Sequence, residues 1–518
     1  MLMSVYFGIK GCLYTFIASG QLPYCREFLN QEGSAYQSFG MIASIPWAMK
    51  ALFGAISDSL PVNGYFKKWY IVLSAVLGTV GVALIAGLQL TSLKLIAAAL
   101  FFAVNAEIAI IDLLCEGRYA ELMAKHPQTG SDLISFVWGC VQLGGLLASF
   151  LVGPLSDAGY IKEMFWLCVP LAAQVLVPTL LNFLAEEQLP AQLRGLQVEK
   201  IAKHKHIFIL ACLLAFAALG LALVTLFLST RAVLSYSIIS AAVLCFLSFK
   251  ILPSLLAKCN FYMFIISTLY VQITGAVDYF YVSNSDCVKG GPSFGYTYYT
   301  TYSTIVQNLF GWVGVIIFQT FLSQWAYRSI FWLSMLLKIA GGMVDLIIVK
   351  RWNKALGISD KLMYMLGYNV VYRVVMMFDF LAGVVLTSKL CPKNLESTVY
   401  ALLAGFQNYG NSLSRSLGIF FIDLLHIRTV SPCNFDNLPG LIILCHVLLP
   451  LLSLPLAFLL IPKATLTDCL LAEDDEIEQS TDSLLDQREN VCSGSTGSCQ
   501  ELNETKLSNE ENKNFIDY

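Results

Sequence analysis

Long apolar runs separated by short polar loops occupy most of residues 3–461. A helix needs roughly 20 predominantly apolar residues to cross the hydrocarbon core of a bilayer. The runs therefore predict an all-α, polytopic membrane protein with about fourteen spanning helices. The expected helices cover residues 3–20, 34–58, 69–90, 92–115, 132–152, 163–184, 207–229, 232–252, 261–281, 298–322, 329–349, 361–388, 396–425 and 438–461.

Composition supports this class and argues against several others. Only 13% of the residues are charged, against about 25% in soluble domains. No basic arm with interleaved aromatic residues suggests a nucleic-acid partner. The five histidines show no metal-ligand spacing, and no nucleophile–base pair suggests an enzyme, so we expect neither a metal, nor another cofactor, nor catalysis.

The expected helices fall into sets of six, two and six. We interpret them as two six-helix halves around a shared cavity, with an extra helix pair between them. The alternative is that one helix of this pair, which is almost free of charge, does not span the membrane. The expected parts are an N-terminal half at 1–185, a linker at 186–205, the inserted pair at 206–258, a C-terminal half at 259–462 and an acidic, disordered tail at 463–518.

Basic residues in short loops predict the orientation, because lysine and arginine are enriched on the cytoplasmic side. The bias places both termini and the loop with Lys67 and Lys68 in the cytoplasm. The basic loop at 350–354 is expected on the opposite side and violates the bias. Cys25, Cys287 and Cys433 fall in loops of that outer side, where either one disulfide or free thiols are compatible with the sequence.

The stretch 44–70 carries charges into the second expected helix. At 100° per residue, Trp47, Lys50 and Asp58 share one helix face. A charge at membrane depth usually faces protein or a water-filled cavity. We expect Trp47 and Lys50 to serve a substrate cavity. Asp58, at the helix end, is expected to close a cytoplasmic gate against Arg118 or the next helix.

The fourth expected helix places Asn105, Asp112 and Glu116 on one face and Glu107 on the opposite one. Asp112 is interpreted as either a cavity residue or a gate residue. An interfacial charge network that locks one conformation is the favoured interpretation for the helix end. Its expected members are Glu116, Arg118, Lys67 and Lys68.

Two late helices carry polar stripes. Arg373 lies in mid-span with aromatic and amide neighbours, which suits a flat anionic ligand, although pairing with Asp379 is the alternative. A second stripe repeats every four residues and ends on Arg415. The candidate substrate-binding residues of these helices are Asn369, Tyr372, Arg373, Gln407, Asn411 and Arg415.

Three motifs resemble those of one family. They are Pro46-Trp47-x-x-Lys50 with Gly54-x-x-x-Asp58, Glu396-Ser397-Thr398-x-Tyr400, and Cys287-x-x-Gly290-Gly291-Pro292. Together they resemble the folate–biopterin transporter family, a branch of the major facilitator superfamily.

The resemblance implies a carrier that moves folate or unconjugated pteridines by alternating access. Proton coupling is a further expectation, with Asp112, Asp278 and Asp379 as candidate carriers. Another organic solute such as S-adenosylmethionine, or a non-transporting sensor, is the alternative. The expected partners are a small-molecule substrate and the lipid bilayer, with a monomeric protein in the plasma membrane.

Overall fold

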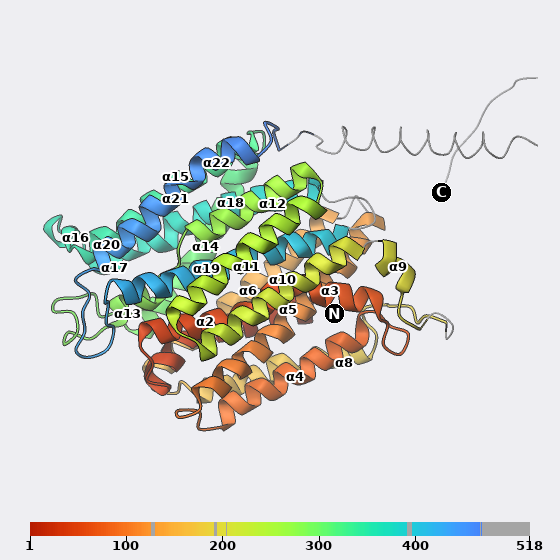
Figure 1. The fold of residues 1–518 in the computed structure, drawn as a ribbon. Helices are drawn as coiled ribbons and strands as arrows, with labels where there is room; N and C mark the ends of the chain where they lie inside the picture. The colour runs from red at the N-terminus through yellow and green to blue at the C-terminus, as the bar shows by residue number, and fades with distance from the viewer. Residues whose placement is uncertain (126–129, 191–193, 204, 391–395, 467, 469–518) are drawn as a thin grey trace, which may run out of the picture. The chain divides into compact units, whose positions relative to one another are not determined.

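Each of the fourteen expected runs lies on a helical segment in the computed structural model, which describes residues 1–125, 130–190, 194–203, 205–390, 396–466 and 468. The long helices run roughly along one common direction (Figure 1). We name the two ends of this bundle by their loops. The disulfide end carries Cys287 and Cys433, which form a disulfide, and the Lys67 end carries the loop between α3 and α4.

The first set contains six helical segments. The first is a continuous rod with local π-helical stretches, and the second is broken at Met49. Their elements are η1 (Ser4–Leu13), α1 (Tyr14–Pro23), η2 (Tyr24–Phe28), α2 (Gly33–Ala48), α3 (Lys50–Ser59), α4 (Lys68–Gly87), α5 (Lys94–Lys125), α6 (Gly130–Asp157), η4 (Glu163–Leu167), α7 (Cys168–Ala173) and α8 (Leu176–Leu180).

The last set contains six more. Its first segment is broken between α12 and α13, at residues 270–273. The elements are α12 (Ser254–Leu269), α13 (Thr274–Val282), η6 (Thr297–Tyr302), α14 (Ser303–Ile317), η7 (Phe318–Leu322), α15 (Tyr327–Val349), α16 (Trp352–Ala355), α17 (Asp360–Tyr364), η8 (Met365–Tyr372), α18 (Arg373–Leu390), α19 (Glu396–Leu424), α20 (Leu438–Ile443), η9 (Leu444–Leu448), α21 (Leu449–Leu451) and α22 (Ser453–Leu460).

Between the two sets come α9 (Val198–Lys203), α10 (Lys205–Phe227) and α11 (Thr230–Ile251). Helices α10 and α11 pack against each other. They also cover the seam between the sets, since α10 contacts α2, α3 and α19, and α11 contacts α19 and α12. Both are long and apolar enough to span a bilayer.

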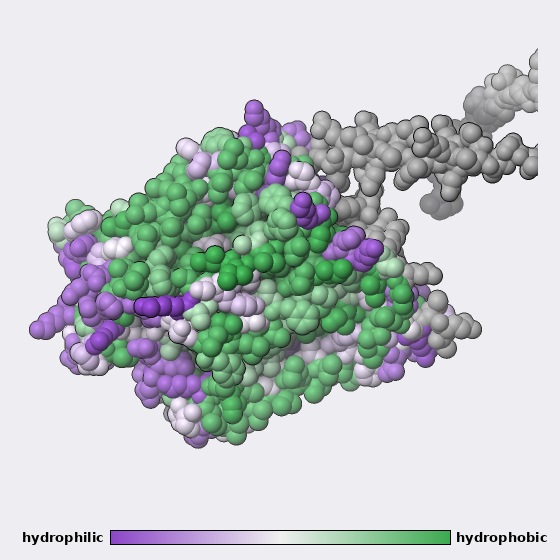
Figure 2. Space-filling model, in the orientation of Figure 1, coloured by the Kyte–Doolittle hydropathy of each residue, from purple (hydrophilic) through white to green (hydrophobic). Residues whose placement is uncertain are grey.

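Among the described residues, twelve segments have the length and composition of a membrane span. The outer surface agrees with this, since Figure 2 shows one face that is largely apolar, with polar residues gathered toward its ends. The rods Ser4–Phe28 and Glu396–Leu424 are not among the twelve. These two more polar rods supply Lys10, Gln407 and Arg415 to the interior.

The basic loop at 350–354 lies beside one carboxylate. Asp360 lies 3.0 Å from Arg351 and 3.1 Å from Lys354, and it accepts a 2.7 Å hydrogen bond from the Asn353 amide. Asp360 therefore offsets part of the positive charge of this loop.

Glu107 faces away from the cavity side of α5, as its helical position predicts. Its side chain is fully buried against Gly78 of α4, where an added Cβ would stand 1.8 Å from a carboxyl oxygen. The described part of the chain places no hydrogen-bond partner beside either carboxyl oxygen. Gly78 therefore makes the room that this carboxyl occupies.

The tail from Cys469 to Tyr518 lies outside the described residues, so its expected disorder stays a prediction.

Candidate functional site

A cavity of about 390 Å³ lies between the two sets of helices. The first set contributes one wall and the last set the other. The cavity extends toward the Lys67 end, because Glu116 and Leu390 near helix ends help to line it. Further lining residues are Lys10, Tyr14, Trp47, Lys50, Asp112, Trp138, Gln142, Asn260, Arg373, Phe380, Gln407 and Asn408.

Asp112 is the centre of the first wall. Its two carboxylate oxygens accept separate bonds, from Lys10 at 2.7 Å and from Lys50 at 2.6 Å. Glu116 lies 3.8 Å from Lys50. Asp112 is 1% exposed, so these charges depend on one another rather than on water. Two cations and two anions leave the cluster with no net formal charge.

Aromatic rings surround the two lysines. The Lys50 ammonium lies 4.9 Å from the Trp47 ring centroid, and Lys10 lies 5.2 Å from that of Trp138. Trp47 is fixed by a 3.2 Å bond from its indole N–H to Asn105. Sequence reasoning missed Lys10 as a site residue. Its position inside an apolar run was the available signal, because lysine at membrane depth is rare.

The break between α2 and α3 brings Trp47 and Lys50 to the cavity. Pro46 lies in the last turn of α2, and Met49 leaves helical geometry with ψ near 0°. The Trp47 carbonyl accepts a 3.1 Å bond from the Asn408 amide of α19. A side chain of the last set thus satisfies a carbonyl beside the break in the first set.

The opposite wall contains Arg373, Gln407 and Asn408. Asp379 does not supply the partner that the sequence offered for Arg373, because its carboxylate binds Lys338 and the Ser334 hydroxyl. Phe380 makes an edge contact with Trp138 at 5.6 Å between centroids. This contact joins the two walls.

Three candidate residues of the last set lie elsewhere than the cavity lining that the described residues form. Asn369 is buried. The oxygen of its side-chain amide accepts hydrogen bonds from the Ser303 hydroxyl and, at 2.8 Å, from the Gln307 amide. Tyr372 packs 5.8 Å from Tyr270 between centroids. Asn411 is half-buried on α19, one turn beyond Gln407.

Arg415 joins α19 to α2 instead of facing the cavity lining. Its guanidinium donates to the Gly40 carbonyl at 2.6 Å, to the Ser44 hydroxyl at 3.0 Å and to the side-chain amide oxygen of Gln272 at 2.8 Å. These contacts explain how an arginine is accommodated in mid-span.

Gln37 of α2 fills the break between α12 and α13. Its amide donates to the Gln272 carbonyl and to the Arg415 carbonyl, each at 2.8 Å, and accepts from the Gly275 N–H at 2.9 Å. Gln37 is 2% exposed. One side chain of the first set therefore satisfies three backbone groups of the last set.

Asp278, on α13, lies at the same seam. Its carboxylate accepts bonds from Tyr36 at 3.0 Å and from Tyr299 at 2.8 Å. Nearby, the Gly33 N–H donates to Thr429 at 2.7 Å. Hydrogen bonds between the sets are thus concentrated on the disulfide side of the cavity.

The expected gate residues lie at the Lys67 end. The Glu186 carboxylate accepts from the backbone N–H groups of Phe66, Lys67 and Lys68, at the start of α4. Arg118 donates to the carbonyls of Leu184 and Ala185, at 3.2 and 2.8 Å. These bonds stay within the first set and its linker.

Asp58 lies in the last turn of α3 and is half-buried.

Within the described ranges, no group of three or more His, Cys, Asp and Glu side chains could hold a metal ion.

Comparison with known proteins gives a consistent result. The model of the BT1 family matches residues 10–481. A relative from Arabidopsis thaliana, probable folate-biopterin transporter 2, is 27% identical over 88% of this chain and 82% of its own length. The folate-biopterin transporter of Synechocystis is 25% identical over 81% of this chain and 73% of its own.

Folate transporter 1 of Plasmodium falciparum is 23% identical over 77% of this chain and 68% of its own length. Among solved structures, a POT family transporter aligns with a TM-score of 0.63, at 15% identity, over 88% of this chain and 94% of its own. A D-xylose-proton symporter aligns with a TM-score of 0.56 at 13% identity, over 89% and 96%. The fold is therefore that of a multi-pass transporter of the major facilitator type.

Proposed function

The chain belongs to the BT1 family, and we propose that it carries folate or an unconjugated pteridine such as biopterin across a membrane by alternating access. The observation that carries this proposal is the cavity between the two sets of helices. It combines aromatic faces with cationic side chains from both walls. Relatives that align with 88% and 81% of this chain are named folate-biopterin transporters, and none of the relatives named above is an enzyme.

The chemistry of the cavity suits such a ligand. A pteridine is flat and rich in hydrogen-bonding groups, and Trp47, Trp138 and Phe380 offer ring surfaces. The amides of Gln407 and Asn408 offer donors and acceptors. Folate adds two carboxylates, for which Arg373 is the proposed partner because its planar fork binds carboxylates in a bidentate manner.

Transport is proposed to occur by rocking of the two halves, 1–185 and 259–462, with 206–258 as an inserted pair and 186–205 as a linker. The Lys67 end faces the cytoplasm in this proposal, which places the Cys287–Cys433 disulfide on the oxidising side. The protein then acts as a monomer, with the plasma membrane as its location.

The gate at the Lys67 end is assigned to Asp58, Lys67, Lys68, Glu116 and Arg118. In this structure Arg118 donates to the carbonyls of Leu184 and Ala185, and the Glu186 carboxylate accepts from the Lys67 N–H. These bonds hold the ends of the helices that carry the proposed gate.

Proton coupling is proposed for Asp112 and Asp379, which are buried, and for Asp278, which is half-buried. Protonation of Asp112 would release Lys10 and Lys50, and protonation of Asp379 would release Lys338. Asp278 is bonded to tyrosines from both sets, Tyr36 and Tyr299. Its titration would change a contact that closes the disulfide side.

The test is uptake of labelled folate, biopterin and S-adenosylmethionine, side by side, in cells that express the chain. Accumulation of folate or biopterin supports the proposal. Accumulation of S-adenosylmethionine alone would reassign the substrate, and binding without accumulation would indicate a sensor.

A substitution tests the proposed role of Arg373. Arg373→Lys keeps the charge but loses the planar fork, so folate affinity should fall roughly ten- to a hundred-fold while biopterin affinity changes less. Arg231→Lys, at an exposed position on α11, is the matched control. Equal losses for the two ligands would remove the assignment of Arg373 to the carboxylates.

A further inference from the structure

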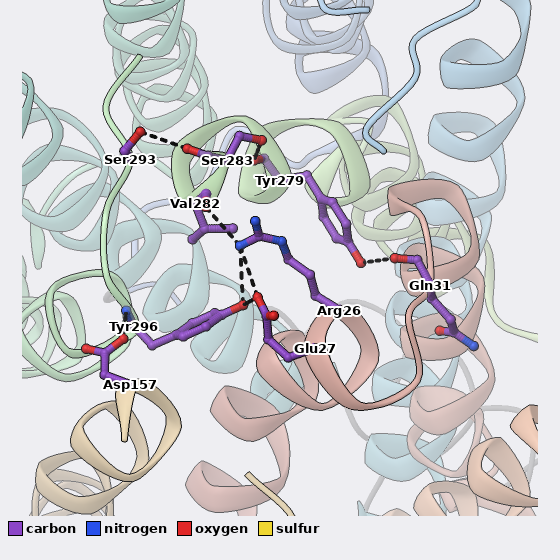
Figure 3. Close-up of polar contacts among 9 residues, drawn as sticks. All are labelled: Arg26, Glu27, Gln31, Asp157, Tyr279, Val282, Ser283, Ser293 and Tyr296. Atoms are coloured by element: carbon purple, nitrogen blue, oxygen red, sulfur yellow. Dashed lines mark hydrogen bonds and ion pairs between the residues drawn. The ribbon is translucent and has the colours of Figure 1, made fainter. Parts of the chain in front are cut away.

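Two charged residues of the first set bind the ends of two helices of the last set, at the disulfide end (Figure 3). Asp157, the last residue of α6, accepts bonds from the backbone N–H groups of Tyr296 and Thr297, each at 2.7 Å. These groups begin the continuous rod Thr297–Leu322. The carboxylate thus lies at the N-terminal end of a helix.

Arg26 makes the opposite contact. Its guanidinium donates to the carbonyl of Val282, the last residue of α13, at 2.8 Å. The same nitrogen lies 3.3 Å from the Tyr296 hydroxyl, which donates to Glu27 at 2.8 Å. Arg26 and Glu27 belong to η2 of the first set.

The signs of the two charges match the helix ends that they contact. The N-terminus of a helix carries a partial positive charge and unbonded N–H groups, and the C-terminus carries a partial negative charge and unbonded carbonyls. An anion at the start of the rod Thr297–Leu322 and a cation at the end of α13 are both favourable. We call these two contacts the helix-end clamps.

The clamps border a surface pocket of about 550 Å³ at the disulfide end. Its lining includes Glu27, Asp157 and Tyr296, together with Gly159, Ile161, Lys162 and Glu163. Beyond the clamps come the seam contacts of Tyr279 with the Gln31 carbonyl, at 2.6 Å, and of Gln37 with Gln272. Of the two clamp residues, Asp157 therefore lines this pocket, and Arg26 binds the end of α13, the helix that carries the seam residue Tyr279.

We propose that Arg26 and Asp157 are the positioning residues that hold the transport path closed at the disulfide end. This rests on the proposed alternating-access function, but not on the identity of the substrate. Opening of that end separates α6 and η2 from the helix ends that they cap. Across the two sets, both charges bind backbone groups, and Arg26 also contacts the Tyr296 hydroxyl, while its ion pair with Glu27, at 3.5 Å, lies within η2. The proposed closure therefore rests on charges bound to helix ends.

The experiment measures the accessibility of two introduced cysteines to a membrane-impermeant maleimide in vesicles of either orientation. Ala276→Cys reports on the seam, because Ala276 is fully buried on α13. Thr387→Cys reports on the cavity that it lines. The parent protein, with its native cysteines, supplies the blank.

Asp157→Asn and Arg26→Gln should each raise the labelling rate at position 276, from the disulfide side, by roughly three- to ten-fold. They should lower labelling at position 387, from the Lys67 side. Unfolding would instead raise both rates, so opposite changes identify a shifted conformational equilibrium. Asp436→Asn and Arg428→Gln, at exposed positions of the same end, should change neither rate.

Further variants distinguish a charge that binds a helix end from an ion pair between two side chains. Asp157→Glu and Arg26→Lys keep the sign of each charge and should retain most of the closure. The exchanged variant Arg26→Asp with Asp157→Arg should stay open, because each new charge would meet a helix end of the same sign. Closure restored by the exchange, unchanged labelling at position 276, or parallel increases at both reporters would overturn the proposal. None of these measurements uses a substrate, so a wrong substrate assignment would not produce them.

Discussion

One carboxylate, Asp112, binds lysines from two other helices. The positions of Lys50 and Asp112 beside the cavity follow from their spacing along α3 and α5. The role of Lys10 does not, since 102 residues separate it from Asp112 and local pattern carries no information on such a pairing. Sequence reasoning placed Arg373 and Arg415 together for a related reason. Both are arginines in mid-span, yet Arg415 contacts α2 and Gln272 instead of the cavity lining.

Asp112→Asn should destabilise the protein, because it leaves the buried Lys50 and the half-buried Lys10 near each other without their shared anion. Loss of one member of a buried charge cluster costs about 3–5 kcal/mol. Adding Lys10→Gln should recover most of the loss in thermal stability, measured on purified protein in detergent. A single variant as stable as the parent would show that water, not Asp112, compensates the lysines.

Gly78→Ala should force Glu107 out of its place, since the added Cβ would stand 1.8 Å from its carboxyl oxygen. Overpacking of this kind costs roughly 1–3 kcal/mol. Glu107→Ala in the same chain removes the contacts with the carboxyl group and leaves only the Cβ of residue 107, at 2.6 Å. The double variant should therefore melt above Gly78→Ala. Equal melting temperatures for these two variants would mean that α4 and α5 adjust by separating.

At the scale of elements, apolar length was sufficient to place the fourteen helical segments. The broken helices were not predicted. Residues 270–273 contain no Gly or Pro that would indicate a break. Their departure from the helix depends on side chains from elsewhere. Ser414 bonds the Tyr270 carbonyl and the Gln272 N–H, and Gln37 bonds the Gln272 carbonyl and the Gly275 N–H. The residue pattern of one segment carries no information about the hydrogen bonds that Ser414 or Gln37 makes from other helices.

Gln37→Leu should therefore lower stability and weaken closure of the seam. It leaves three buried backbone groups without their partner, and each such group costs about 1–3 kcal/mol. Gln37→Glu keeps the acceptor for Gly275 but loses both donors, so its melting temperature should lie below that of the parent. Ser38→Ala, whose hydroxyl bonds within its own helix, serves as the control. A Gln37→Leu protein as stable as Ser38→Ala would contradict this role.

At the scale of the molecule, the chain directly after α22, up to Asp468, is attached to the helix bundle. The Tyr327 N–H donates to Ala464 and the Leu466 N–H to Trp325, each at 3.1 Å, while Lys389 donates to the carbonyls of Leu466 and Asp468. Hydrogen bonds from Thr465 also hold the pKa of Asp468 below its ordinary value. The acidic composition predicted a dispensable tail, but not that its first residues would be bound.

A chain ending at Ala472 should retain uptake at matched surface levels, because it keeps the attached part. A chain ending at Pro462 should lose stability, since the bonds to Trp325, Tyr327 and Lys389 go with it. Surface abundance and uptake per molecule, measured on both proteins, check the two outcomes. Loss of specific uptake in the longer protein would give the tail a part in the transport cycle.

The polarity of the two rods Ser4–Phe28 and Glu396–Leu424 has a consequence for synthesis at the ribosome. The translocon passes a segment into lipid according to its own hydrophobicity, and a lysine near the centre opposes that step. Lys10 is made 102 residues before Asp112, so the first rod must be retained beside the translocon until α5 arrives. Arg415 is made 375 residues after Gly40 and enters a membrane that already holds its acceptor. Insertion of the first rod therefore depends on chain still to come, and insertion of the later rod on chain already in place.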